Sequence, residues 1–178
     1  MRFANRSTSV LVATDIAARG LDITQLEVVI NVDITPDADA DTHTHHIGRT
    51  GRADEDGWAF SLASLDEMGT VGRIEKAGNF VGDWQPLASL TPANPAPLLP
   101  PMQTIQILGG RKEKICPGGV LGALTKDLGF ADAQIGKMNV NEFSTYVAVA
   151  RDIAQQVLKK LSTTKVKGKT VKVRLLEG

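Results

Sequence analysis

The chain has 178 residues, of which 42% are apolar, and it carries 20 basic and 20 acidic side chains. That is enough apolar material for one or two domains with buried cores. No apolar run approaches the roughly 18 residues of a membrane helix, and the start lacks the apolar stretch of a secretion signal. A single cysteine, Cys116, excludes an internal disulfide and a structural zinc site. We therefore expect a soluble, cytoplasmic protein without a metal site or a membrane partner.

The net charge of zero conceals two halves of opposite sign. Residues 1–102 carry seven Lys and Arg against 14 Asp and Glu, a net charge of −7. Residues 103–178 carry 13 against six, a net charge of +7. A basic half of this kind suggests a polyanionic partner, because Lys and Arg neutralise phosphates. A lysine-rich surface that is merely solvated would give the same count.

Three short apolar runs in the first half have the character of parallel strands. They are residues 10–13 (VLVA), 28–32 (VVINV) and 58–62 (WAFSL). Continuous apolar runs are typical of strands that are buried on both faces. Helical character follows over residues 38–47, and over 66–80 after the capping residue Ser64. The alternation predicts an α/β layer fold, and because three strands are few for such a fold, we expect that earlier strands are missing.

A proline-rich segment separates the two halves. Residues 90–101 hold five of the eight prolines, a density that no helix or central strand tolerates. The segment therefore predicts a semi-rigid linker that extends by about 3 Å per residue. The predicted domains are residues 1–84 and 103–178, with a linker over 85–102.

The second half predicts the order βαββαβ. Strand candidates cover residues 104–108, 134–140, 144–149 and 170–176, and helix candidates cover 117–128 and 151–161. Pro117 and Gly129 are start and stop signals for the first helix, and the apolar spacing of residues 153–161 is helical. In this arrangement two helices cover one face of the sheet and leave the other face open for a ligand.

Polar residues follow the first apolar run in the string VLVATDIAARGLDI, residues 10–23. In open parallel sheets ligands bind beyond the carboxyl ends of the strands. A hydroxyl such as that of Thr14, together with backbone N–H groups at a helix start, can hold a phosphate. The alternative is a plain strand-to-helix turn that Thr14 and Asp15 cap.

A second string, HHIGRTGR, occupies residues 45–52 and contains Arg49 and Arg52. Two arginines three residues apart can share one side of a helix end. Each guanidinium stays charged and offers a planar fork that matches phosphate oxygens, so a pair favours a polyphosphate. In phosphoryl transfer, neutralising the negative charge of the phosphates is most of the catalysis. The alternative is that both arginines pair with the acidic residues 54–56.

Together these two strings resemble motifs V and VI of DEAD-box RNA helicases, in which motif VI reads HRIGRTGR. The resemblance implies a RecA-like second helicase domain in which Thr14 and Gly20 contact the RNA sugar-phosphate strand. It also implies that Asp22 contacts the ATP ribose. Arg49 and Arg52 then reach the terminal phosphates of ATP, one of them as the catalytic arginine finger.

The second half resembles the RNA-binding domain at the C-terminus of the DbpA and YxiN branch of bacterial DEAD-box helicases. The strings GGRKEKICPGGVLGALTKDLG, IGKM, YVAV and VKGKTVKVRLLEG carry this likeness. It implies an RRM-like module that binds a hairpin of large-subunit ribosomal RNA during ribosome assembly. The two resemblances together cover nearly the whole chain.

The aromatic platform of a common RRM is largely absent from this module. Such a platform stacks bases on the two central strands, but Gln106 takes the aromatic place on the first strand and the third offers only Tyr146. Tyr146 either stacks a base or belongs to the core or sheet edge. Basic residues must then do more, which makes binding salt-dependent. The candidate RNA contacts are Arg111, Lys112, Lys114, Lys137, Tyr146, Lys167 and Lys169, with Lys165, Lys172 and Arg174 near the last strand.

Two features of the family pattern are missing, and one residue departs from it. Neither GxxxxGK[ST] nor a DEAD tetrapeptide occurs in the chain, although phosphoryl transfer needs a phosphate loop and acidic residues for Mg²⁺. We therefore expect ATP and Mg²⁺ only in a complete helicase with a missing N-terminal helicase domain, and no ATP hydrolysis by this chain alone. His46 replaces a family arginine, which leaves that arginine's contact open. The alternative function is a stand-alone, non-catalytic RNA-binding module.

Overall fold

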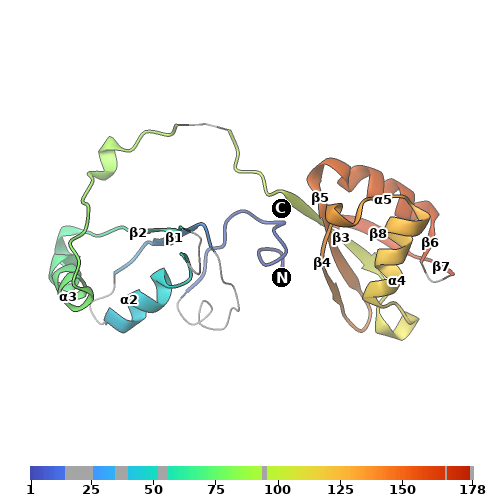
Figure 1. The fold of residues 1–178 in the computed structure, drawn as a ribbon, viewed down its shortest axis with the longest axis horizontal. Coiled ribbons are helices and arrows are strands. Elements are labelled where there is room, and N and C mark those ends of the chain that lie inside the picture. Colours follow the sequence, from blue (N-terminus) through green and yellow to red (C-terminus); the bar gives the residue numbers. More distant parts are fainter. Residues whose placement is uncertain (15–25, 35–39, 52–55, 94–95, 167, 177–178) are drawn as a thin grey trace. The chain divides into compact units, whose positions relative to one another are not determined.

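The computed structural model describes residues 1–14, 26–34, 40–51, 56–93, 96–166 and 168–176 (Figure 1). It divides the chain into two compact units. The first unit is Thr14–Pro95, and the second unit joins Met1–Ala13 to Ala96–Gly178. The boundaries expected at residues 84 and 103 stay predictions, and the first 13 residues group with the second unit.

The first unit contains a parallel β-α-β crossover. Strands β1 (Val28–Asn31) and β2 (Trp58–Ser61) pair in parallel, and helix α2 (Ala40–Ile47) lies between them in the chain. Parallel strands need such a crossover because a tight turn cannot join them. A 3₁₀ turn over Leu65–Glu67 then leads into helix α3 (Met68–Gly78).

The carboxylate of Glu67 ties the start of α3 to its surroundings. One of its oxygens accepts the Ile34 N–H at 3.0 Å, and the other accepts the N–H and the hydroxyl of Ser64, each at 2.7 Å. The bonds from Ser64, and then that from Ile34, favour the charged form and lower the pKa of Glu67. The predicted position of Ser64, directly before the helical segment, is confirmed.

Two expectations for the apolar runs of the first half are wrong. Residues 10–13 form no strand, and Val12 is 92% exposed. The other two runs do form β1 and β2, but Trp58 is 67% and Phe60 51% exposed, so these strands are not buried on both faces. The reason is that, among the described residues, β1 and β2 make a sheet of two strands, which is too narrow to be covered on both sides.

The second unit has the predicted βαββαβ order. Its main elements are β3 (Met102–Leu108), α4 (Pro117–Gly122), β4 (Ile135–Val140), β5 (Thr145–Ala150), α5 (Ala154–Thr163) and β8 (Lys172–Leu176). A π-helical turn, Ala123–Asp127, extends α4, and a short hairpin of β6 (Lys165–Val166) and β7 (Lys169–Thr170) precedes β8. The antiparallel sheet has the order β4-β5-β3-β8.

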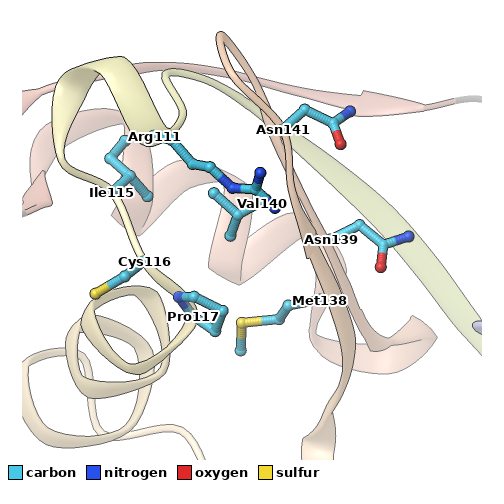
Figure 2. A pocket seen from close by; sticks show the side chains of 8 residues that line it. All are labelled: Arg111, Ile115, Cys116, Pro117, Met138, Asn139, Val140 and Asn141. Carbon is cyan, nitrogen blue, oxygen red and sulfur yellow. The ribbon is translucent and has the colours of Figure 1, made fainter.

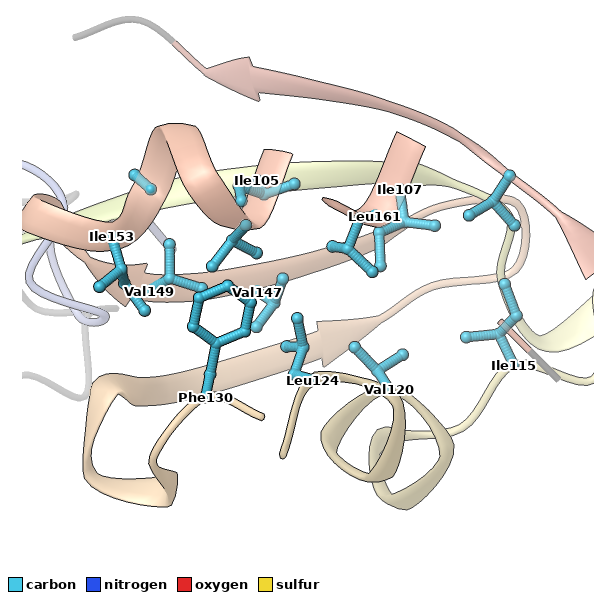
Figure 3. Close-up of a cluster of buried hydrophobic side chains, with 13 residues drawn as sticks. Ile105, Ile107, Ile115, Val120, Leu124, Phe130, Val147, Val149, Ile153 and Leu161 are labelled. Carbon is cyan, nitrogen blue, oxygen red and sulfur yellow. The ribbon is translucent and has the colours of Figure 1, made fainter. Parts of the chain in front are cut away.

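One face of this sheet packs against α4 and α5 (Figure 3). Thirteen buried apolar residues form the cluster, including Ile105 and Ile107 from β3, Leu124 from the π-helical turn and Leu161 from α5. These four side chains have no exposed surface. Burying each such side chain stabilises a fold by about 1.5–3 kcal/mol, so this cluster accounts for a single well-packed module.

The opposite sheet face is partly covered by the start of the chain. Side chains alternate along a strand, so Thr104 points away from the core that contains Ile105. Its Oγ1 accepts a hydrogen bond from Asn5 Nδ2 at 3.0 Å and lies 2.6 Å from Ser7 Oγ. The Met102 N–H donates to the Arg6 carbonyl at 3.2 Å. The N-terminal segment thus occupies one end of the open face.

Candidate nucleic-acid interface

The loop that follows β3 is held against the turn between β4 and β5. The Arg111 N–H donates to the Asn141 carbonyl at 2.9 Å, and the Lys112 N–H donates to the Glu142 carbonyl at 3.1 Å. A Cβ built on Gly110 would lie 2.2 Å from the Asn141 carbonyl oxygen, so a side chain cannot be accommodated there. Gly110 therefore serves the packing of the protein's own backbone.

Four predicted cations are exposed on this loop and on β4. Arg111, Lys112 and Lys114 belong to the loop, and Lys137 belongs to β4. Lys112 Nζ lies 3.1 Å from Glu142 Oε1 and 4.7 Å from the ring centroid of Phe143. Because both partners of that ion pair are exposed, the pair is weak, and a phosphate can compete for the ammonium.

A chain of hydrogen bonds crosses the open face of the sheet. Arg174 Nε donates to Gln106 Oε1 at 2.5 Å, and Gln106 Nε2 donates to the Tyr146 hydroxyl at 3.1 Å. Gln106 stands opposite Tyr146 on β5 and opposite Arg174 on β8. Tyr146 is therefore a half-buried member of the open face rather than of the core, and its hydroxyl is engaged by Gln106.

A groove of about 450 Å³ lies between the loop after β3 and strand β4 (Figure 2). Its lining residues are Arg111, Ile115, Cys116, Pro117, Met138, Asn139, Val140 and Asn141. Of these, only Arg111 was among the sequence candidates. The others were missed because they lie on the separate segments 115–117 and 138–141, which only the tertiary structure brings together.

Of the residues predicted to bind the nucleotide, Arg49 alone lies among the described residues. Arg49 follows the end of α2, is half-buried, and its Nη2 lies 2.6 Å from His45 Nε2. Its carbonyl accepts the Leu26 N–H at 3.1 Å, which places Arg49 beside the amino end of β1. Thr14 is exposed.

Several predicted residues lie outside the description. Gly20, Asp22, Arg52 and Lys167 fall outside the described residues, and Lys169 belongs to β7 without a described side chain. The structure therefore tests no grouping of Asp22 with the two arginines.

His43, in the middle of α2, contacts a different partner from His45, which lies beside Arg49. His43 Nε2 lies 3.3 Å from Ser61 Oγ at the carboxyl end of β2. Burial, and secondarily the neighbouring His46, lowers the pKa of His43. The neutral form of His43 is therefore favoured at its contact with the sheet.

The described residues contain neither a metal-binding cluster nor a membrane-spanning helix. No three His, Cys, Asp or Glu side chains are grouped there so that they could hold a metal ion. Likewise, no helix in the described part of the chain is long and apolar enough to cross a membrane.

Two family models match the chain. Residues 1–54 match the helicase conserved C-terminal domain, and residues 104–175 match the DbpA RNA binding domain. The ATP-dependent RNA helicase DbpA of Escherichia coli (strain K12) is 45% identical over 179 residues, which cover 99% of this chain and 38% of that protein. These matches confirm the resemblance and the predicted fold class, RecA-like followed by RRM-like.

Other relatives match a shorter part of the chain. The ATP-dependent RNA helicase DDX42 of Homo sapiens is 49% identical over 81 residues, which cover 46% of this chain and 7% of that protein. The ATP-dependent rRNA helicase RRP3 of Coccidioides immitis (strain RS) is 46% identical over 76 residues, 43% of this chain and 16% of that protein. The chain thus spans less than two fifths of the length of any of these three relatives.

Proposed function

The chain belongs to the DbpA-type DEAD-box RNA helicases, whose C-terminal part it matches, and from this premise we propose that its second unit binds a hairpin of large-subunit ribosomal RNA. The observation that carries the proposal is the exposed cationic loop Arg111–Lys114, held by backbone hydrogen bonds to the turn after β4. A rigid loop presents its charges without a large ordering cost.

Phosphate contacts supply the affinity in this proposal. Arg111, Lys112, Lys114 and Lys137 are exposed, and each phosphate that a cation neutralises releases counterions. Lys167 and Lys169 in the second unit, and Thr14 and Gly20 in the first unit, are proposed as further RNA contacts. We expect this binding to take place in the cytoplasm.

Affinity for RNA tests this function directly. Fluorescence anisotropy would compare a labelled large-subunit ribosomal hairpin with an unrelated duplex of equal length, using the full chain at moderate salt. We expect tighter binding of the hairpin. Equal affinities for the two RNAs would refute the proposal.

A matched pair of charge variants locates the contact. Lys112→Ala with Lys114→Ala removes two charges from the loop, and Lys126→Ala with Lys159→Ala removes two exposed charges from the π-helical turn and α5. The loop variant should lower the slope of log K against log salt by about 1.4–1.8, whereas the control leaves the slope unchanged. Equal slopes for both variants would exclude the loop.

The first unit would complete a nucleotide site in a full-length helicase. Arg49 and Arg52 would neutralise the terminal phosphates of ATP, and Asp22 would contact its ribose. In such an enzyme, ATP with Mg²⁺ supplies the phosphoryl group whose transfer drives the cycle. The support from the described residues is limited to Arg49, whose guanidinium His45 orients at the end of α2.

The second candidate is a stand-alone module without ATPase activity. It is favoured by the separate buried core of the second unit, on which the candidate RNA contacts of the loop after β3 lie. Purified chain, freed of nucleases and contaminating ATPases, should release no phosphate from ATP in the presence of the hairpin. RNA-stimulated turnover would overturn this candidate. A reading frame that continues upstream into GKT and DEAD strings would instead favour a piece of a helicase.

A further inference from the structure

Three polar side chains are buried where the start of the chain meets β3. Thr104 has no exposed surface, Ser7 is 3% exposed and Asn5 is 6% exposed. Asn5 Nδ2 donates to Thr104 Oγ1 at 3.0 Å, Ser7 Oγ donates to Asn5 Oδ1 at 2.6 Å, and the Thr104 and Ser7 hydroxyls lie 2.6 Å apart. The Thr104 hydroxyl proton is then left for Ser7, so the three side chains close a ring of hydrogen bonds. Such a buried, satisfied ring specifies one placement of the segment.

Apolar packing adds little to this placement. No residue of the segment 1–13 belongs to the buried cluster of the second unit or to the partly buried side chains packed against it. The large apolar side chains that the segment exposes are Met1, Val10, Leu11 and Val12. Hydrogen bonds that break when the segment leaves are replaced by bonds to water, so their net contribution is modest. The segment is therefore held specifically, but it can be released.

The same segment is bonded to the end of the proline-rich linker. Ser9 Oγ donates to the Leu98 carbonyl at 2.9 Å. Just beyond the linker, the Met102 N–H donates to the Arg6 carbonyl at 3.2 Å. Ser9 and Leu98 are 89 residues apart in the chain, so the two bonds join the start of the chain to the segment that leads into β3.

These bonds lie on the two chain connections of the first unit. The first unit, Thr14–Pro95, is inserted between the two parts of the second unit, Met1–Ala13 and Ala96–Gly178. One connection leaves the second unit after Ser9 and the other returns to it before Leu98. While the segment is bound, both connections are fixed to the second unit. When the segment leaves, the linker is the one connection that remains, and a chain fixed at one end has more conformations than a closed loop.

We propose that residues 1–9 are a releasable strap that restricts the motion of the two units relative to each other. Residues 10–13 alone separate the strap from the first unit, and four residues span at most about 14 Å. A bound strap therefore leaves the first unit little freedom to reorient, whereas a released strap leaves it on the linker. The inference concerns the coupling of the units and does not depend on the proposed RNA binding.

Removal of the Thr104 hydroxyl tests the strap. Thr104→Val keeps the branched shape of the side chain but opens the ring of hydrogen bonds. The Met102 amide, which donates to the strap, should then exchange with solvent about 10-fold faster, because the strap is open in more molecules. The Arg151 amide donates to the Pro101 carbonyl at 2.9 Å, so it is the internal reference and should change little. Amide exchange of the full chain is followed by NMR.

Thr145→Val is the matched control. Thr145 also has no exposed surface, and its hydroxyl donates to the Gly109 carbonyl at 2.9 Å rather than to the strap, so Met102 exchange should not change. Asn5→Ala with Ser7→Ala removes the other two members of the ring and leaves the buried cluster of the second unit intact. This double variant should accelerate Met102 exchange as Thr104→Val does. If it exchanges like the unchanged chain, the ring does not hold the strap and the proposal is wrong.

Rotational diffusion tests the coupling of the units. Relaxation of backbone ¹⁵N nuclei gives a rotational correlation time for each unit of the full chain. Both times should shorten in Thr104→Val and in the Asn5→Ala, Ser7→Ala variant, because each unit then tumbles more independently, whereas Thr145→Val should match the unchanged chain. If Met102 exchange accelerates but the correlation times stay the same, the strap opens without freeing the units, and the proposal is refuted.

Discussion

The two units of this protein bury their apolar residues to very different degrees. In the second unit thirteen buried residues form one cluster between a four-stranded sheet and two helices. In the first unit, among the described residues, the buried cluster contains only Ile34, Val71 and Ile74. Both units use alternating strands and helices, so the difference shows that element order alone does not produce a core. Among the described residues, the first unit has a sheet of two strands and the second unit a sheet of four, so the second unit offers its helices more surface to cover.

The exposed aromatic side chains of β2 also show that the first unit is less well covered. Trp58 and Phe60 stack on each other, with ring centroids 6.2 Å apart and planes 6° apart, yet both are more than half exposed. Exposed apolar patches of this kind mark interaction sites or association-prone surfaces. The open sheet face of the second unit instead carries the hydrogen-bonded polar side chains of Gln106, Tyr146 and Arg174. We therefore expect the units to differ in stability and in association.

Limited proteolysis should show the largest difference. The free energy of local unfolding ranges, within one protein, from near zero to the value for global unfolding. If the two units differed by about 4 kcal/mol, their unfolded populations would differ about 1,000-fold. Trypsin should cut within residues 14–95 first and leave a resistant fragment that begins near residue 103. The second half holds 13 of the 20 Lys and Arg residues, so its resistance cannot reflect a lack of sites. Equal digestion of both halves would contradict the expected difference in stability between the two units.

The second-largest difference should be the loss of stability when a core isoleucine is replaced by alanine in each unit. Ile107→Ala, at a side chain with no exposed surface, should lower the free energy of unfolding of the second unit by about 2–5 kcal/mol. Ile74→Ala should cost the first unit clearly less, since few neighbours surround it. Both tryptophans, Trp58 and Trp84, lie in the first unit and the lone tyrosine, Tyr146, lies in the second, so fluorescence during urea unfolding separates the units. Equal losses would mean that the cores are equivalent.

Acid should destabilise the first unit through Glu67. Its pKa is lowered in the folded state by hydrogen bonds from Ser64 and Ile34, so its contribution is complete above the pKa of an unfolded glutamate. The contribution is lost as the pH falls through the lower folded pKa. Urea unfolding followed by tryptophan fluorescence at a series of pH values should show this decline, and Glu67→Gln should reduce it. An unchanged decline in the variant would assign the effect to other groups.

Replacing the exposed aromatic pair should have the smallest effect on stability. Trp58→Ser with Phe60→Ser should change the free energy of unfolding by about 0.5 kcal/mol or less, as at most exposed sites, but should reduce self-association of the chain. Sedimentation velocity at several protein concentrations measures the association, and circular dichroism during urea unfolding measures the stability. Loss of stability without a change in association would show that the pair belongs to the fold.

The sequence predicted the order of the main elements in residues 102–176 correctly, and it did so for a physical reason. The strand predicted at residues 104–108 is β3 (Met102–Leu108), and the helix predicted from Pro117 begins there. Periodicity is informative when one face of each element is buried, because burial then repeats every two or 3.6 residues. The first half of the sequence gave weaker results for the same reason. Residues 10–13 read as a buried strand, but a strand also needs neighbours, and the described chain pairs none with it.

The sequence by itself determined the charge of each half, the motif strings and the order of the elements in residues 102–176. These features depend only on residue identity and local spacing. Which segments meet was decided only by the tertiary structure: Gly110 against Asn141, Gln106 between Arg174 and Tyr146, and Arg111 across from Met138 and Val140. Such meetings depend on sheet order and strand register, which set distances between residues far apart in the chain. No local pattern encodes those distances.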